Sequence, residues 1–216
     1  MNIVSVILAR GGSKGIPKKN IIDINGKPLI YYSIEASKKS VVSKTFVSTD
    51  SDEIAEISIR HGASGRIERP KHLATDDSKS DDALLHFANI IDFDILVFIQ
   101  PTSPMINHFY INEGIDMIIN GGYDSVFTAT KEHWIPKWNN NIEPVDWDIY
   151  NRPMRQDKEN LYTENGMFYI TKRKNLLESK LRYSGKIGIV EIPLKDSFQI
   201  DSMDDLELIK RLKIND

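Results

Sequence analysis

Cationic side chains and glycines are concentrated near the beginning of the chain. Arg10-Gly11-Gly12-Ser13-Lys14-Gly15, with Lys18 and Lys19 shortly after, directly follow the apolar run 3–9. Glycines let backbone N–H groups approach an anion closely, and fixed cations neutralise its charge. Such a loop at the end of a strand predicts a polyphosphate site, and the alternative is a solvated basic turn.

The types and spacing of the residues in this loop suggest individual roles. Arg10 can bind two oxygens with its forked guanidinium, and Lys14 and Lys19 act as mobile point charges, so we interpret these three as catalytic. Lys18 is adjacent to Lys19 and should point to the opposite side, as a solvated surface lysine. The loop matches neither G-x-x-x-x-G-K-[ST] nor G-x-G-x-x-G, because Ile16 follows Gly15 and because Gly11 and Gly12 are adjacent.

Strand and helix patterns alternate along the whole chain. We expect strands over 3–9, 45–48, 95–99, 125–130, 166–170 and 187–192. Helices should begin at Pro28, near Ser51, before Ala83, after Asn107 and after Asp201. The Asn107 helix should bury Ile118 and Ile119, among others, and the last helix should bury Met203, Leu206 and Ile209.

Repeated β-α-β units with short connections predict a mostly parallel sheet covered by helices on both faces. The expected fold class is therefore α/β, a three-layer, Rossmann-like arrangement in a single domain over 1–216. Ligands of such sheets bind outside the carboxyl ends of the strands. Each loop that follows a strand is therefore a candidate wall of the site.

One segment, 131–163, interrupts this alternation. It holds the three tryptophans of the chain together with three prolines and an Asn-Asn-Asn turn, and it is too long for an ordinary connection. Aromatic residues on such an excursion suggest a surface for a partner. The alternative is a flap that folds back over its own domain.

Composition excludes several classes of protein. The chain of 216 residues has a net charge of −3 and no cysteine, so disulfides, thiol catalysis and cysteine-bound zinc are excluded, and a nucleic-acid partner has no electrostatic support. The five histidines have no ligand-like spacing. The first apolar run is too short for a signal peptide or a membrane span, so we expect a cytoplasmic protein.

Four motifs in order resemble one family over nearly the whole chain, from Ile7 to about Leu206. They are Ala9–Asn20 (A-R-G-G-S-K-G-I-P-x-K-N), Gln100–Pro104 (Q-P-T-S-P), Arg152–Tyr169 (R-x-R-Q-D and Y-x-E-N-G-x-F-Y) and the acidic segment Asp196–Asp205. The chain resembles the N-acylneuraminate cytidylyltransferases, which activate nine-carbon 2-keto sugar acids. The resemblance implies a nucleotidyltransferase fold, CTP and a sugar acid as substrates, Mg²⁺, and a homodimer built with the 131–163 segment.

The resemblance also assigns substrate-binding residues. Gly11 and Ser13 belong to the phosphate loop, and Arg69 and Ser80 match positions that contact cytosine. We expect Asn20, at the end of the loop, to bind the base as well, because its amide offers both a donor and an acceptor. Ser80 could instead cap the helix that follows it. Asp76 and Asp77 would repel phosphates at close range, so we interpret them as residues that order their loop.

The acceptor sugar would meet a second set of residues. Gln100 follows a buried strand and matches a position that faces the sugar, although it could instead tie down its own loop. Arg155 can pair with the carboxylate of a sugar acid through two hydrogen bonds. Asn165 precedes a glycine where backbone can approach a ligand. Arg152 could equally be an interface or a surface residue, and Thr163-Glu164 replaces an arginine found in one branch of the family.

Asp201 matches the metal-binding aspartate of the family, and its alternative role is to cap the last helix. The family usually has a second aspartate two residues earlier, where this chain has Gln199, so a single Mg²⁺ on Asp201 is expected. The sequence assigns no general base. The predicted reaction is CTP-dependent transfer of CMP to a nonulosonic acid with release of pyrophosphate. The alternatives are a cytidylyltransferase for the eight-carbon acid Kdo or another keto acid, and a nucleotide-sugar-binding protein without catalysis.

Overall fold

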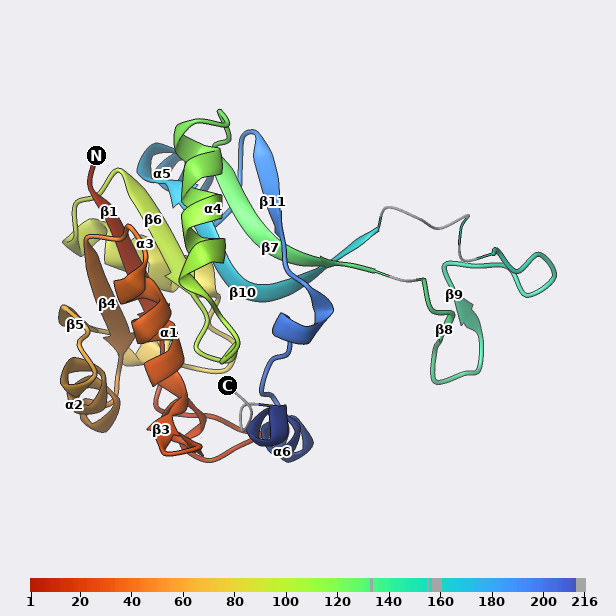
Figure 1. Ribbon diagram of the computed structural model, residues 1–216, viewed down its shortest axis with the longest axis horizontal. Helices are drawn as coiled ribbons and strands as arrows, with labels where there is room; N and C mark the ends of the chain where they lie inside the picture. The colour runs from red at the N-terminus through yellow and green to blue at the C-terminus, as the bar shows by residue number, and fades with distance from the viewer. Residues whose placement is uncertain (133, 155, 157–160, 213–216) are drawn as a thin grey trace.

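A mostly parallel sheet forms the centre of the molecule in the computed structural model, which describes residues 1–132, 134–154, 156 and 161–212 (Figure 1). Its seven strands, in order across the sheet, are β11 (Ile187–Glu191), β7 (Ser125–Lys131), β10 (Tyr162–Lys172), β6 (Ile95–Ile99), β1 (Ile3–Leu8), β4 (Lys44–Thr49) and β5 (Gly65–Glu68). All neighbouring pairs are parallel except those of β10, which runs antiparallel to both β6 and β7.

Helices cover both faces of the sheet, as the alternation predicted (Figure 1). The side chains of β1 explain this arrangement, because Ile3 and Ile7 join one buried cluster and Val4 and Val6 join another. A strand whose two faces are both buried needs apolar residues at consecutive positions. The helices of the first face are α1 (Leu29–Lys39), α2 (Asp52–Arg60) and α4 (His108–Ile119), and those of the second are α3 (Ser80–Ile90) and α5 (Arg173–Ser179).

Local capping confirms several of the expected boundaries. Ser51 accepts a hydrogen bond from the N–H of Ile54 at the start of α2, and Asn107 accepts one from the N–H of Phe109 at the start of α4. Pro28 precedes α1 in extended conformation. Two burial predictions are wrong: Ile119 is 45% exposed and Met203 is 53% exposed, because each lies at the end of a helix beyond the packed face.

A third, smaller core joins the cationic loop to the end of the chain. Ile16 from the loop is buried with Ile200 and with Leu206 of α6 (Met203–Leu212), beside the β2–β3 hairpin (Asp23–Ile24 and Lys27–Pro28). Burying a side chain of this size stabilises the packed state by about 1.5–3 kcal/mol. This cluster therefore holds the loop and the segment before α6 against each other, although almost the whole chain separates them.

Residues 134–154, between β7 and β10 in the chain, extend away from the sheet instead of folding back over it (Figure 1). We call these residues the arm. The arm carries the β8–β9 hairpin (Lys137–Trp138 and Pro144–Val145), and the ring of Trp147 meets those of Trp138 and Trp134 at centroid distances of 5.1 Å and 6.3 Å. These contacts hold the three rings together as a partly exposed aromatic cluster.

Arg182 and Asp81 form a largely buried ion pair that fixes the start of α3. The guanidinium donates to both carboxylate oxygens, at 3.2 Å and 2.7 Å, and the backbone N–H of Arg182 donates to the same carboxylate at 2.8 Å. The guanidinium also lies 5.0 Å from the ring centroid of Tyr169. Since Asp81 directly follows Ser80, this pair sets the position of the first turn of α3.

Asp81→Ala should lower the free energy of unfolding by about 2–4 kcal/mol, because it leaves a poorly solvated guanidinium without its partner. Burial opposes the charged form of Asp81, but Arg182 prevails and holds the pKa of that carboxyl below its ordinary value. The stabilisation is therefore fully present above about pH 4 and is lost as the pH falls through the lowered pKa.

Chemical denaturation at pH 7 and at pH 3 measures this difference. The control is Asp52→Ala, which breaks an ion pair with Arg66 in which the carboxylate is 86% exposed. That change should cost less than about 1 kcal/mol. Equal losses in the two variants would contradict a structural role for the Asp81 pair.

Candidate active site

A cleft of about 480 Å³ opens at the carboxyl ends of β1 and β6. This is the edge at which parallel sheets of this kind bind their ligands. The predicted site residues that line the cleft are Arg10, Ser13, Lys14, Lys19, Asn20, Arg69, Ser80, Gln100 and Asp201. Three further predicted residues do not belong to this set: Gly11 and Asn165 do not line the cleft, and Arg155 lies outside the described residues.

The two neighbouring lysines of the loop point in different directions, as expected. Lys19 is only 17% exposed, lines the cleft and donates to Asp201 at 2.9 Å. Lys18 instead donates to both carboxylate oxygens of Glu53, at 2.9 Å and 2.7 Å, on α2. The cause is a left-handed backbone at Lys18 (φ 53°), which ends the loop and starts the short helix η1 (Lys19–Ile21).

Two buried polar side chains line the inner wall of the cleft. Asn20 is 5% exposed and donates to the backbone carbonyl of Arg10 at 2.9 Å, so it also holds the phosphate loop in place. Arg69 is 6% exposed and donates to the hydroxyl and the backbone carbonyl of Ser48, at 3.1 Å and 2.6 Å. Burial lowers the pKa of Arg69 to about 10, with the charge of Asp50 opposing the shift, so the guanidinium stays positive at neutral pH.

Ser80 is the first residue of α3 and lines the cleft. Lys79 occupies the capping position and makes no side-chain cap bond. The alternative role of Ser80 as the helix cap is therefore not what the structure contains. Ser80 and the buried Arg69 both line the cleft.

Asp201 is not the cap of the last helix either. Ser202 performs that task, since its hydroxyl accepts from the N–H of Asp205 at 3.2 Å, and the Asp205 carboxylate accepts from the backbone N–H of Ser202 at 2.8 Å. The hydrogen bond from the Ser202 hydroxyl is the first cause that lowers the pKa of Asp205, followed by those from the backbone N–H groups of Asp201 and Ser202. The Asp201 carboxylate, 69% exposed, is thus left to face the cleft and Lys19.

Gln100 and Gln199 approach the chain at Gly166. A Cβ atom on that glycine would lie 2.8 Å from the Gln100 Oε1 atom and 2.8 Å from the Gln199 Nε2 atom, and the backbone there has a positive φ of 67°. Both amides line the cleft. Asn165, the preceding residue, donates to the hydroxyl of Thr130 at 3.2 Å and accepts from the N–H of Met167, so it shapes this turn.

Two carboxylates, Asp50 and Asp76, bind the phosphate loop, and the sequence analysis did not predict these contacts. Asp50 accepts from the backbone N–H of Gly11 at 2.8 Å, which explains why Gly11 turns away from the cleft. Asp76 accepts from Arg10 at 2.6 Å and from Lys14 at 2.8 Å. A signal existed for Asp50, because it directly follows β4 at the carboxyl edge of the sheet. For Asp76 the sequence predicted only that it orders its own loop. The structure adds its ion pairs with Arg10 and Lys14.

Gly15→Ala should lower the rate of pyrophosphate release by about tenfold or more. A displacement of about 1 Å in the groups that position a substrate can lower a rate by about a hundredfold. A Cβ on Gly15 would lie 2.8 Å from the backbone carbonyl oxygen of Asp201, so the loop and the segment before α6 would have to separate. Gly12→Ala is the matched control, because nothing lies within 4 Å of its Cβ position. Steady-state rates of pyrophosphate release test both, and equal behaviour of the two variants would contradict the close packing at Gly15.

The fold and the cleft together define a three-layer α/β protein with a cationic cleft at the carboxyl edge of its sheet. Two solved structures share this fold. One is the CMP:2-keto-3-deoxy-manno-octonic acid synthetase complexed with CTP, with a TM-score of 0.77 and 20% identity over 100% of this chain and 99% of that one. The other is the 4-diphosphocytidyl-2C-methyl-D-erythritol synthase of Anaerococcus prevotii, with a TM-score of 0.72 and 12% identity over 99% and 98%.

The cytidylyltransferase family model matches residues 4–216. The N-acylneuraminate cytidylyltransferase A of Danio rerio is 37% identical over an alignment of 209 residues that covers 93% of this chain and 48% of that protein. The pseudaminic acid cytidylyltransferase of Campylobacter jejuni is 32% identical over 228 residues, 100% of this chain and 98% of that protein. The chain belongs to the cytidylyltransferase family. It spans about half the length of its fish relative.

Every helix in the described residues is too short or too polar to cross a membrane.

Proposed function

We propose that this protein transfers CMP from CTP to a nine-carbon 2-keto sugar acid and releases pyrophosphate. The observation that carries the proposal is the cleft itself. Loop cations, a buried arginine and an exposed carboxylate from segments far apart in the chain line a single cavity at the carboxyl edge of the sheet. The relatives named above act, by their names, on N-acylneuraminate and pseudaminic acid, which supports a nonulosonic acid as acceptor.

In the proposed reaction an oxygen of the acceptor hydroxyl attacks the α-phosphorus of CTP. A new P–O bond forms, the bond from the α-phosphorus to the bridging oxygen breaks, and pyrophosphate leaves with the bonding electrons. The proton of the acceptor hydroxyl passes to water. Arg10, Lys14 and Lys19 would neutralise the triphosphate and its transition state, and such positioning and electrostatic stabilisation account for most of the catalysis of phosphoryl-type transfer.

Asn20, Arg69 and Ser80 would bind the cytosine. The buried guanidinium of Arg69 and the Asn20 amide offer donors and an acceptor with fixed orientation, which a planar base requires. On the other side of the cleft, Gln100 and Gln199 offer two amides for the hydroxyls of a sugar. We further propose that the Ser13 hydroxyl binds a phosphate oxygen, that Gly11 shapes the phosphate loop through its bond to Asp50, and that Arg155 and Asn165 belong to the acceptor side.

Magnesium fits the residues at Asp201. Mg²⁺ is usually held by one or two carboxylates, phosphate oxygens and water. Asp201 presents one exposed carboxylate, the neighbouring Gln199 is neutral, and the described residues contain no cluster of three or more acidic, histidine or cysteine ligands. We propose a single Mg²⁺ held by Asp201 and the nucleotide, where the ion would neutralise phosphate charge.

The test is release of pyrophosphate from CTP with a panel of sugar acids, with and without Mg²⁺. N-acetylneuraminate, Kdn, legionaminate, pseudaminate and Kdo form the panel. Mg²⁺-dependent turnover with a nine-carbon acid is expected. Turnover with Kdo alone would contradict the proposed acceptor class, and binding of CTP without turnover on any acceptor would contradict catalysis.

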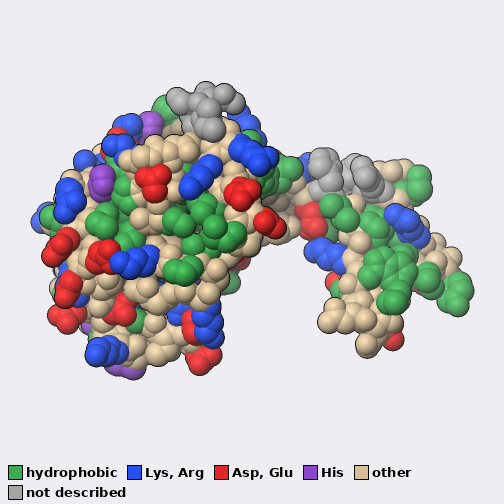
Figure 2. Space-filling view, turned by 90° about the horizontal axis from the view of Figure 1, so that it is seen from below, with side chains coloured by type: hydrophobic (Ala, Val, Ile, Leu, Met, Phe, Trp, Pro, Cys, Tyr) green, Lys and Arg blue, Asp and Glu red, His purple; other side chains and the backbone are tan. Residues whose placement is uncertain are grey.

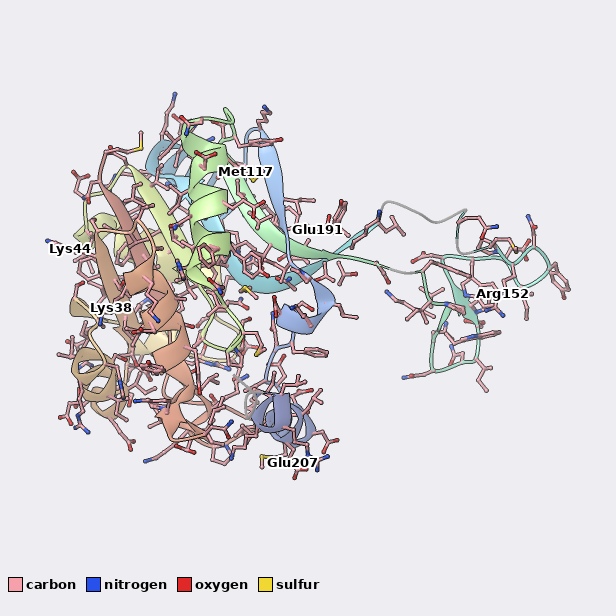
Figure 3. All side chains as sticks on the ribbon, viewed as in Figure 1. Lys38, Lys44, Met117, Arg152, Glu191 and Glu207 are labelled. Carbon is pink, nitrogen blue, oxygen red and sulfur yellow. The ribbon has the colours of Figure 1, made fainter. Side chains whose placement is uncertain are left out.

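We also propose that the arm mediates a homodimer. Large apolar side chains are exposed on it, among them Ile135 (63%), Trp138 (47%) and Tyr150 (96%), and Figure 2 shows hydrophobic side chains gathered there. Arg152 also lies on the arm, away from the sheet (Figure 3), with its guanidinium carbon 5.9 Å from the Trp147 ring centroid. Sedimentation analysis should give a dimer, and Tyr150→Asp with Ile135→Asp should give a monomer. A wild-type monomer at micromolar concentration would contradict this proposal.

A cytoplasmic location remains a prediction from the sequence, which cell fractionation would test.

A further inference from the structure

Asp76 binds two of the three cations that would hold the proposed triphosphate. One carboxylate oxygen lies 2.6 Å from the Arg10 guanidinium, and the other lies 2.8 Å from the Lys14 ammonium. All three side chains line the cleft. A carboxylate that bridges two cations in this way makes the contacts that two oxygens of a phosphate group would make.

The other two lysines of the loop, Lys18 and Lys19, also have carboxylate partners. Lys18 is paired with Glu53 outside the cleft, and Lys19 is paired with Asp201. A polyanion that enters the cleft at Arg10 and Lys14 therefore meets the Asp76 charge at hydrogen-bond distance from its own oxygens. Two like charges so close repel each other.

We propose that Asp76 is an internal competitor of the triphosphate, held on Arg10 and Lys14 and displaced from them when the triphosphate binds. This inference rests on the proposed function, and it adds an autoinhibitory contact to the same site. Asp76 belongs to the turn before α3, where the Ser78 hydroxyl donates to the carbonyl of His72 at 2.7 Å. This turn leads directly into Ser80, the first residue of α3.

The change in phosphate affinity on removal of the Asp76 charge distinguishes a competitor from a residue that supports phosphate binding. A carboxylate that merely orients Arg10 and Lys14 would strengthen phosphate binding, and its removal would weaken it. A competitor would weaken phosphate binding, and its removal would strengthen it. The sign of the change in affinity is thus decisive.

The experiment measures the binding of inorganic tripolyphosphate by calorimetry, without Mg²⁺ and at constant ionic strength. Asp76→Asn should bind about tenfold more tightly than wild type, because two competing ion pairs and one nearby repulsion disappear. Asp77→Asn is the matched control, since it removes the same charge from the adjacent, exposed residue, and it should stay within about twofold of wild type. Weaker binding by Asp76→Asn, or binding equal to that of Asp77→Asn, would overturn the proposal.

A second measurement uses the wild-type protein, so it holds even if a variant fails to fold. Hydrogen bonds from Lys14 and Arg10 hold the pKa of Asp76 below its ordinary value. Carbon-13 NMR of the Asp76 carboxyl should show this pKa rising by about one unit or more when tripolyphosphate is added, because the carboxyl loses its cations and gains an anionic neighbour. An unchanged pKa with tripolyphosphate bound would overturn the displacement.

Failure of the proposed function has a different signature. It would appear as no release of pyrophosphate from CTP with any sugar acid, whatever the ranking of the tripolyphosphate affinities.

Discussion

Lys19→Ala is expected to lower the rate of CTP-dependent pyrophosphate release by about a hundredfold or more. Lys19 lines the cleft, is only 17% exposed and donates to Asp201, so its charge lies where phosphate and Mg²⁺ would meet. An ammonium at low exposure is screened little by water, and a charge that develops on phosphate oxygens in the transition state gains most from it. The loss should therefore appear in kcat more than in KM.

Lys18→Ala is the matched control for this prediction. It removes the same side chain from the adjacent position, but Lys18 is paired with Glu53 on α2, outside the cleft. Its rate should stay within about threefold of wild type, because Lys18 does not line the cleft. Its stability should also change little, since an exposed ion pair contributes at most about 1 kcal/mol. Thermal unfolding of both variants separates catalysis from folding. Equal kinetic losses in the two variants would show that the opposite orientations of these lysines have no catalytic meaning.

Asp201→Asn is expected to lower the rate by about a thousandfold at ordinary Mg²⁺ concentrations, since a bound metal supplies several kcal/mol of charge stabilisation. The substitution keeps the shape of the side chain and removes the charge that would hold the ion. The helix that follows should remain intact, because Ser202 and Asp205 form its cap without the Asp201 side chain. Raising the Mg²⁺ concentration should restore part of the activity.

Asp204→Asn provides the comparison, because this exposed residue lies in the first turn of α6 and does not line the cleft. It should leave both the rate and the Mg²⁺ dependence close to those of wild type. Rates measured over a series of Mg²⁺ concentrations decide the question. A wild-type Mg²⁺ profile in Asp201→Asn would exclude Asp201 as the metal-binding residue.

Local patterns in the sequence predicted most of the elements around the cleft. The apolar run before Arg10, the buried run before Gln100 and the caps Ser51 and Asn107 all depend on residues within a few positions of one another. Both the preference of a strand for apolar residues and the hydrogen bond of a cap operate at that range. The family motifs added the predicted roles of the loop cations, Arg69 and Asp201, which remain predictions until the variants are measured.

Strand β10 illustrates where local patterns were insufficient. The sequence indicated a strand only over 166–170, but β10 covers Tyr162–Lys172 and runs antiparallel to its neighbours. Its first residues are polar and exposed. They are extended because Tyr162, Thr163 and Glu164 pair with β7, with a register shift before Tyr169. Pairing with a distant strand leaves no periodic signal in a polar segment.

What this chain encodes locally is a cationic, glycine-rich loop after a buried strand, and a succession of strands and helices that must form layers. Those features follow from the preferences of neighbouring residues. The partner of each charge does not. Lys19 meets Asp201 across 182 positions of sequence, and Arg10 meets Asp76 across 66. Such pairs exist only after the sheet has brought its carboxyl edge together, because Coulomb attraction depends on distance in space and not on separation along the chain.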